Sequence, residues 1–276
     1  MDTSTIQNII IGKDSNLSRE LFKKNSNFIV LSSRDIFLDI FILSAYKDSK
    51  VRLIFNNFQP STELGSSSSY SKYIQRAILL TSMVLDYFNA KKIVKIIYTS
   101  SSSVYGNNSL CSEKDDVRVM NFHASLKISN EKMIESFCKN HNIDYTIARI
   151  FNMYGGDDKF SIISKIINTY NNRERLTIVN EGSAIRDFIH IDNVVEIYIK
   201  LLFEKNITVL NIGTGRGNSV KDILSFLNSY AKKIDTINIM RDEIKVSTAN
   251  IKLLQSILDN NNFIRVETYL KEKLSL

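Results

Sequence analysis

Short apolar runs alternate along the first half of the chain with stretches in which apolar residues recur every three or four positions. Five runs predict strands: 7–11, 28–32, 51–56, 93–99 and 144–149. Three stretches have the spacing of helices: 16–24, 73–90 and 123–140. Strands that alternate with helices in this way predict an α/β fold with a doubly wound parallel sheet.

The pattern changes at about residue 150, after which turns, helices and brief strands follow one another without regular alternation. We therefore expect a larger first domain over residues 1–150 and a smaller C-terminal lobe over residues 151–276. Part of the second segment is expected to return to the sheet of the first. A chain of 276 residues is long enough for this arrangement.

Composition narrows the class of protein. The formal net charge is +7, but Lys and Arg are interleaved with Asp and Glu, so we do not expect nucleic-acid binding. Two cysteines, Cys111 and Cys138, and three histidines predict neither a disulfide framework nor a metal site. No apolar run approaches the roughly 18 residues of a membrane span, and no signal peptide is evident. We expect a cytoplasmic protein without a membrane partner.

A serine cluster follows the most apolar of the predicted strands, in the segment YTSSSSVYG at residues 98–106. The carboxyl ends of parallel strands face the ligand crevice of an open sheet, so hydroxyl groups there can bind a substrate oxygen. Serines also fill turns with no further role, and the cluster alone does not decide between the two.

Three charged or titratable residues share one face of the helix predicted over 123–140. His123, Lys127 and Glu131 are spaced four residues apart, which places them one turn after another. They could form a proton-transferring group beside the serine cluster. The spacing alone is equally typical of a solvated Lys/Glu face.

Two further segments suit an anionic ligand. RIFNMYG at residues 149–155 is followed by IRDFIHID at 185–192, in which Arg186 offers the planar fork of donors that fits a phosphate. LNIGTGRG at 210–217 is a glycine-rich turn before a helix, but it lacks the Lys-Ser/Thr ending of a phosphate-binding P-loop.

Taken in this order and spacing, these segments resemble the extended short-chain dehydrogenase/reductases, the group of nucleotide-sugar epimerases and dehydratases. The resemblance covers essentially the whole chain. It implies a Rossmann-type domain over 1–150 that binds NAD or NADP, and a substrate-binding lobe over 151–276. It also implies a homodimer formed through the helices 73–90 and 123–140.

The resemblance assigns roles residue by residue. Ser101, four residues before the Tyr of VYG, would polarise a sugar hydroxyl or keto oxygen. Lys127 would hold the nicotinamide ribose and assist proton transfer. Asn152 and Arg186 would bind the diphosphate, the sugar or the nucleotide of the substrate.

The cofactor residues implied by the resemblance lie near the first two strands. Gly12 matches the first glycine of the dinucleotide fingerprint, and Asp39 with Ile40 resembles the acidic step that reads adenine. Arg34 lies where some relatives receive the 2′-phosphate of NADP.

Three departures from the family pattern concern the catalytic and cofactor residues. His123 stands where the family has the tyrosine of Y-x-x-x-K, and an imidazole can act as acid and base near neutral pH. The fingerprint reads GKDSNLS from residue 12 and keeps only its first glycine. Ala77 stands nearest the helix asparagine that supports the proton relay.

We therefore expect hydride transfer at a sugar carbon by an epimerase, a dehydratase or a 4-ketoreductase in polysaccharide precursor synthesis. The alternative is a degenerate homologue that binds a nucleotide-sugar or a partner without redox turnover. Retained Ser101, Lys127, Asn152 and Arg186 favour the enzyme. The altered fingerprint, Ala77 and His123 favour the alternative.

Overall fold

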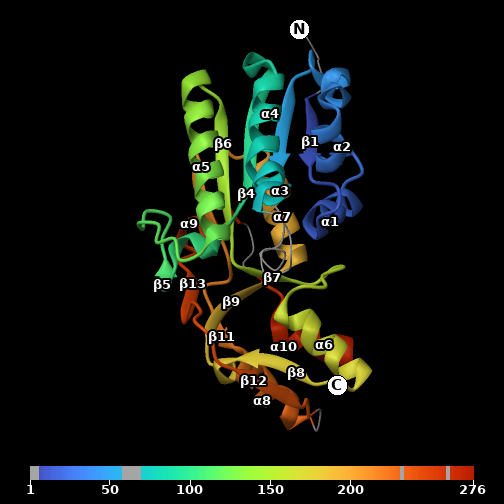
Figure 1. Cartoon of the computed structure of the whole chain (residues 1–276), viewed down its shortest axis with the longest axis vertical. Helices are drawn as coiled ribbons and strands as arrows, with labels where there is room; N and C mark the ends of the chain where they lie inside the picture. Colours follow the sequence, from blue (N-terminus) through green and yellow to red (C-terminus); the bar gives the residue numbers. More distant parts are fainter. Residues whose placement is uncertain (1–5, 58–69, 231–232, 259–261) are drawn as a thin grey trace. The chain divides into compact units, whose positions relative to one another are not determined.

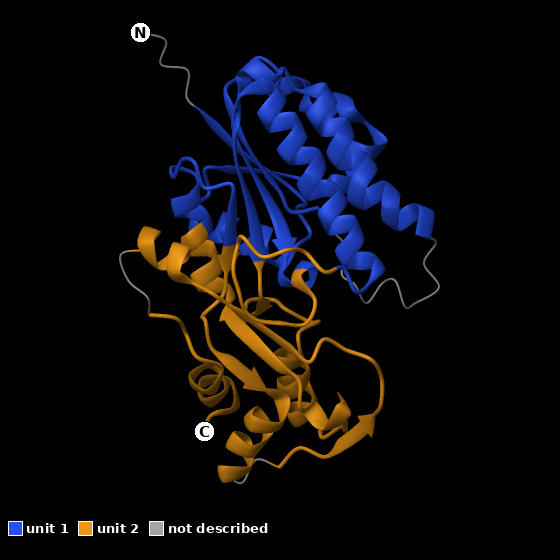
Figure 2. Ribbon diagram, turned by 90° about the vertical axis from the view of Figure 1, so that its left-hand side faces the viewer, with its two compact units in different colours: residues 1–104, 119–149, 198–210 blue, residues 105–118, 150–197, 211–276 orange. Residues whose placement is uncertain are grey.

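The computed structural model describes residues 6–57, 70–230, 233–258 and 262–276 (Figure 1). The chain forms two compact units, which Figure 2 shows in different colours. Unit 1 comprises residues 1–104, 119–149 and 198–210, and unit 2 comprises residues 105–118, 150–197 and 211–276. Each unit is built from segments that are separated in the sequence.

A six-stranded sheet within the described residues forms the centre of unit 1, with the strand order β10-β6-β4-β3-β1-β2. Its strands are β1 (Gln7–Ile11), β2 (Phe28–Leu31), β3 (Val51–Phe55), β4 (Ile93–Ser101), β6 (Asp144–Ile150) and β10 (Val209–Ile212). β1 pairs in parallel with β2 on one side and β3 on the other, and β3 pairs in parallel with β4. The chain therefore reverses its direction of winding at β1 and β3. The predicted Rossmann-type α/β class is confirmed.

Helices pack against this sheet along an apolar core. They are α1 (Asn16–Lys24), α2 (Ser33–Leu38), the 3₁₀ helix η1 (Ile40–Tyr46), α3 (Tyr70–Ile74), the π-helical turn η3 (Gln75–Leu79), α4 (Leu80–Tyr87) and α5 (Phe122–His141). Ile9, Leu53 and Ile96 of the strands are fully buried with Val84 of α4 and Ile134 of α5. The helix expected over 73–90 is thus divided by a π-helical turn.

Unit 2 contains shorter strands and a second core. Its main sheet has the order β11-β9-β13-β5 with β7 paired to β9, and β12 pairs with β8. These strands are β5 (Asn108–Cys111), β7 (Asn152–Tyr154), β8 (Leu176–Val179), β9 (Ile185–His190), β11 (Gly217–Ser219), β12 (Thr236–Ile239) and β13 (Val246–Ala249). The helices that follow residue 150 are α6 (Ile162–Asn172), α7 (Ile191–Leu201), α8 (Val220–Ser229), α9 (Lys252–Ile257) and α10 (Val266–Leu274). α6, α8 and α10 enclose the second core.

Both cysteines are buried thiols. Burial raises the pKa of Cys111 to about 11 and that of Cys138 to about 12. No helix in the described part of the chain is both long and apolar enough to cross a membrane.

Candidate functional site

The serine cluster lies at the carboxyl end of β4, as the sequence predicts. Ser101 is the last residue of this strand, and its Oγ accepts a hydrogen bond of 3.2 Å from the N–H of Ser103. Within the described residues, no acceptor is found for the hydroxyl proton of Ser101. The Oγ of Ser103 is buried and likewise has no partner among these residues. The hydroxyl group of Ser101, which is partly exposed, is therefore available at this strand end to a ligand oxygen.

Lys127 of α5 reaches the same strand end. Its side chain is buried, and Nζ donates a 2.7 Å hydrogen bond to the carbonyl oxygen of Thr99, two residues before Ser101. Nζ also lies 5.2 Å from the ring centre of Tyr98. Burial lowers the pKa of Lys127 to about 7, although the charge of Glu131 opposes this shift. The ammonium of Lys127 can therefore release a proton near neutral pH. His123 lies one turn earlier on α5 and is partly exposed.

Glu131 anchors this end of α5 to the sheet. Its carboxylate accepts hydrogen bonds from Arg149, with Nε at 3.2 Å and Nη2 at 2.7 Å, and another from the hydroxyl of Ser100. Lys127 and Glu131 are both only 4% exposed. The solvated-face alternative for this helix is therefore wrong.

The π-helical turn η3 brings Ala77 into the same network. Asn130 of α5 is fully buried, and its Nδ2 donates to the carbonyl oxygen of Ala77 at 2.7 Å and to the Tyr98 hydroxyl at 3.1 Å. A π-turn disturbs the regular ladder of a helix, which leaves a carbonyl for such a partner. Burial raises the pKa of Tyr98 well above its ordinary value, so its hydroxyl stays protonated. The sequence did not single out Asn130 or Tyr98.

The altered fingerprint forms the turn between β1 and α1. Gly12 has a φ of +119°, and a Cβ on it would lie 2.3 Å from the carbonyl oxygen of Asn56, directly after β3. The first N–H groups of α1 have no acceptor within the helix, and such groups suit a phosphate. The buried Oδ1 of Asn57 has no partner among the described residues, and the backbone nitrogen of Asn57 lies 2.9 Å from the position that a Cβ on Gly12 would take. These features fit a dinucleotide at the point where the winding reverses.

The other predicted cofactor residues lie after β2. Arg34 is exposed in the first turn of α2. Asp39 is exposed between α2 and η1, where its Oδ1 accepts a 2.9 Å hydrogen bond from the N–H of Phe41. Ile40 is partly buried against the core of unit 1. Their contact with a cofactor stays a prediction.

The predicted substrate residues Asn152 and Arg186 lie in unit 2. Asn152 of β7 donates from Nδ2 to the carbonyl oxygen of Asp187 at 3.1 Å, which fastens β7 to β9. Arg186 forms a 3.0 Å ion pair from Nη2 to Oε2 of Glu243, and its side chain is only 18% exposed. Burial lowers the pKa of Arg186, and the charge of Glu243 opposes the shift. A phosphate at Arg186 must share the guanidinium with Glu243.

Asp187 organises the glycine-rich turn after β10. Its Oδ1 accepts from the backbone N–H and the hydroxyl of Thr214 at 2.8 and 2.6 Å, and its Oδ2 accepts from the N–H groups of Gly215 and Ala249 at 2.8 and 3.1 Å. A Cβ on Gly213 would lie 2.7 Å from this Oδ2. The turn is therefore folded around a carboxylate of the protein itself. Sequence patterns gave no signal for this role of Asp187.

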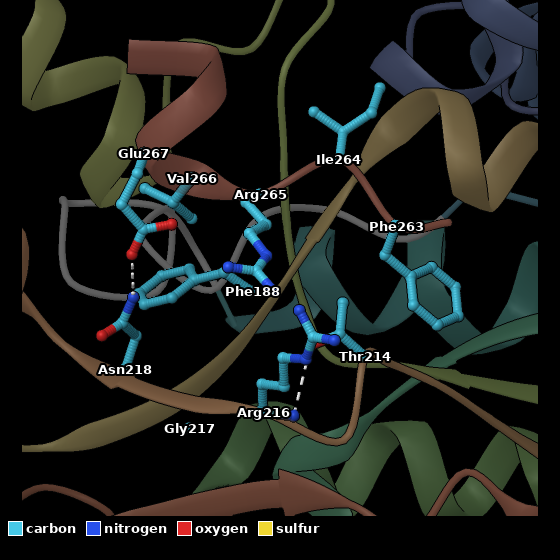
Figure 3. A pocket seen from close by; sticks show the side chains of 10 residues that line it. All are labelled: Phe188, Thr214, Arg216, Gly217, Asn218, Phe263, Ile264, Arg265, Val266 and Glu267. Atoms are coloured by element: carbon cyan, nitrogen blue, oxygen red, sulfur yellow. Dashed lines mark hydrogen bonds between the residues drawn. The ribbon is translucent and has the colours of Figure 1, made fainter. Parts of the chain in front are cut away.

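Several hollows open among the described residues of unit 2. One of about 220 Å³ has Phe188, Arg216 and Arg265 in its wall, and Figure 3 shows both arginine side chains extending into it. Another of about 860 Å³ is bordered by Glu243 and Arg241. Glu243, whose carboxylate pairs with Arg186, lines the second hollow.

Comparison with known proteins identifies the family. The sequence profile described as "NAD dependent epimerase/dehydratase family" matches residues 15–213, which is more than half of the chain. The chain belongs to this family. The resemblance predicted from the sequence motifs is confirmed, and the nicotinamide cofactor expected from them is that of the family.

Similar proteins include a dTDP-D-glucose 4,6-dehydratase of Dictyostelium discoideum, which is 29% identical over 241 residues. The match covers 82% of this chain but 48% of the dehydratase, so the chain spans about half the length of this relative. An ADP-L-glycero-D-manno-heptose-6-epimerase of Brachyspira hyodysenteriae is 27% identical over 94% of this chain and 84% of the epimerase.

The fold is also that of solved family structures. MoeE5 in complex with UDP-glucuronic acid and NAD superposes with a TM-score of 0.86, covering 98% of this chain and 99% of MoeE5. The two sequences are 19% identical, so this likeness establishes the fold alone.

Proposed function

We propose that this member of the epimerase/dehydratase family transfers hydride between NAD or NADP and a carbon of a nucleotide-activated sugar, as an epimerase, a dehydratase or a 4-ketoreductase. The observation that carries the proposal is Lys127. Its buried ammonium, with a pKa of about 7, is fastened to Thr99 at the end of β4, beside the available hydroxyl of Ser101. A buried cation with so low a pKa at a strand end is typical of a catalytic group.

Bound NAD or NADP supplies the hydride acceptor and donor. The turn at Gly12 would hold its pyrophosphate, and Asp39 with Ile40 would contact its adenine. Arg34 would contact the adenosine ribose or its phosphate, and Lys127 would hold the nicotinamide ribose.

Ser101 and His123 perform the proton chemistry in this proposal. The Ser101 hydroxyl donates a hydrogen bond to the reacting sugar oxygen. His123 takes the proton from that oxygen when the sugar is oxidised and returns it when the ketone is reduced. When Lys127 is charged, it favours the neutral form of the His123 imidazole, because like charges repel.

Asn152 and Arg186 are proposed to bind the diphosphate and nucleotide of the substrate. Arg186 supports this role because a guanidinium can meet two phosphate oxygens at once. We also propose a cytoplasmic homodimer that supplies polysaccharide precursors. Exposed apolar side chains on the predicted dimer helix 73–90 support the dimer: Ile74 and Leu79 are 39% and 43% exposed.

The test compares His123→Phe and His123→Tyr with the wild type. Each protein is supplied with NAD or NADP, oxidised or reduced, and a panel of UDP-, dTDP-, GDP-, CDP- and ADP-sugars. Tritium exchange at the sugar carbon and epimer formation report hydride transfer. We expect His123→Phe to lose roughly 10²–10⁴-fold in kcat, the usual contribution of a general acid–base group. His123→Tyr should retain turnover with a different pH profile. Binding of nucleotide-sugars by wild-type protein without any hydride transfer would instead support the alternative without redox turnover.

A further inference from the structure

A cluster of three polar side chains occupies the space around the altered fingerprint turn. Nδ2 of Asn56 donates to Oγ of Ser15 at 2.6 Å and to Oγ of Ser18 at 2.9 Å. The Ser15 hydroxyl donates in turn to Ser18 Oγ at 2.9 Å. Asn56 is 7% exposed and Ser18 is fully buried. Each hydrogen of the Asn56 amide therefore has its own acceptor on α1.

Ser15 and Ser18 stand where the second and third glycines of a dinucleotide fingerprint would be. Those glycines let the pyrophosphate approach the backbone and let the helix pack close to the strand. A side chain at either position needs a place away from the phosphate and out of the helix–strand contact. Here both hydroxymethyl groups are directed to Asn56, which follows β3.

Asn56 also fixes the turn through its backbone. Its N–H donates to the carbonyl oxygen of Ile11 at 2.8 Å, and its own carbonyl oxygen occupies the space that a Cβ on Gly12 would need. Ser15 is the N-cap of α1 and accepts a 3.0 Å hydrogen bond from the N–H of Ser18. One residue therefore contacts the end of β1, the retained glycine and the first turn of α1.

We propose that Asn56 is a positioning residue for the dinucleotide, which keeps the side chains of Ser15 and Ser18 clear of the pyrophosphate. The lock formed by Asn56, Ser15 and Ser18 replaces the two missing glycines. This inference rests on the proposed function, because it assigns the lock to binding of the cofactor. It also explains how a turn with a single fingerprint glycine can serve a dinucleotide.

The proposal predicts a specific rescue. In Asn56→Ala the two serine side chains lose the amide that donates to them, so we expect the dissociation constant of NAD to rise by roughly tenfold or more, the scale of two lost hydrogen bonds. The triple variant Asn56→Ala/Ser15→Gly/Ser18→Gly has no side chains left to misplace, and glycine is tolerated at an N-cap. It should bind NAD almost as tightly as the wild type. A merely structural role of Asn56 does not predict this recovery.

A matched control removes another amide from the same strand pair. Asn8 of β1 accepts a 3.3 Å hydrogen bond from Arg52 of β3 at the opposite end of the two strands. Asn8→Ala should lower the thermal midpoint without weakening NAD binding. A rise in its NAD dissociation constant equal to that of Asn56→Ala would overturn the assignment of the lock to the cofactor.

The experiment measures NAD binding by calorimetry and amide hydrogen exchange of residues 12–19 in the protein without NAD. We expect faster exchange and weaker NAD binding in Asn56→Ala, and recovery of the affinity in the triple variant. Exchange stays fast in the triple variant, because Ser15→Gly also removes the N-cap hydrogen bond of α1. Unchanged exchange and affinity in Asn56→Ala, or no recovery of NAD affinity in the triple variant, would overturn the lock while leaving the proposed function intact. If the wild-type protein binds neither NAD nor NADP, although Asn56→Ala still changes amide exchange, both the cofactor role of the lock and the proposed function would be overturned.

Discussion

Two buried carboxylates, one in each unit, hold residues of the candidate site by different means. Glu131 in unit 1 faces a guanidinium, that of Arg149, and also accepts from Ser100. Asp187 in unit 2 accepts four hydrogen bonds from uncharged donors, three of them backbone N–H groups. A countercharge stabilises the first, and oriented dipoles stabilise the second.

The difference determines which substitutions destabilise each unit. An ion pair is made by two side chains, so both can be exchanged together for apolar groups of similar volume. A carboxylate held by backbone N–H groups cannot be replaced together with its donors in this way, because a change of side chain leaves the backbone N–H groups in place. Burial raises the pKa of Asp187 even though its hydrogen bonds oppose the shift.

The largest effect is expected from breaking the ion pair on one side. Arg149→Met leaves the carboxylate of Glu131 buried without its countercharge and should lower the free energy of unfolding by about 3–5 kcal/mol. The double variant Arg149→Met/Glu131→Leu should recover most of the loss. Urea unfolding followed by circular dichroism measures both. Equal destabilisation of the single and the double variant would contradict this account of the pair.

A smaller loss is expected for Asp187→Asn. The amide nitrogen would face N–H donors where a carboxylate oxygen now accepts, which should cost about 1–3 kcal/mol. The exposed Asp116 of the same unit is the matched control, and Asp116→Asn should change the urea midpoint little. If Asp187→Asn changes the urea midpoint as little as Asp116→Asn does, the proposed contrast between Glu131 and Asp187 is wrong.

A third effect concerns the pH dependence of stability beside the ion pair. The pKa of Lys127 is about 7 in the folded chain against an ordinary value of 10.5, so the unfolded chain binds more protons between these values. Stability should therefore rise with pH in that window, by at most about 1.4 kcal/mol per pH unit. Lys127→Met should lack this rise in urea unfolding measured at a series of pH values. The same dependence of unfolding free energy on pH in the wild type and in Lys127→Met would contradict this prediction.

Local patterns were sufficient for the strands of unit 1 and for some helices. The runs 7–11, 28–32 and 51–56 match β1, β2 and β3 to within one residue, because continuous apolar segments are buried on both faces of a parallel sheet. The helix at 16–24 matches α1, which Ser15 caps. The π-helical turn inside 73–90 was not predictable, because its acceptor site is used by Asn130 from a distant helix.

The site was predictable only where the spacing was local. Lys127 and Glu131 share a helix face, but their burial depends on Thr99 and Arg149, which the spacing does not reveal. The lock on Ser15 joins residues 41 positions apart. The sequence of the fingerprint turn shows only that two glycines are missing. The compensating side chain of Asn56 lies elsewhere in the chain and leaves no local signal.

The buried thiols have a practical consequence for spectroscopy. Maleimides react with the thiolate, and the raised pKa values of Cys111 and Cys138 leave almost none of it at neutral pH. Both sulfur atoms also belong to fully buried residues. A cysteine introduced on the surface of either unit can therefore carry a fluorophore or a spin label while both natural cysteines stay in place.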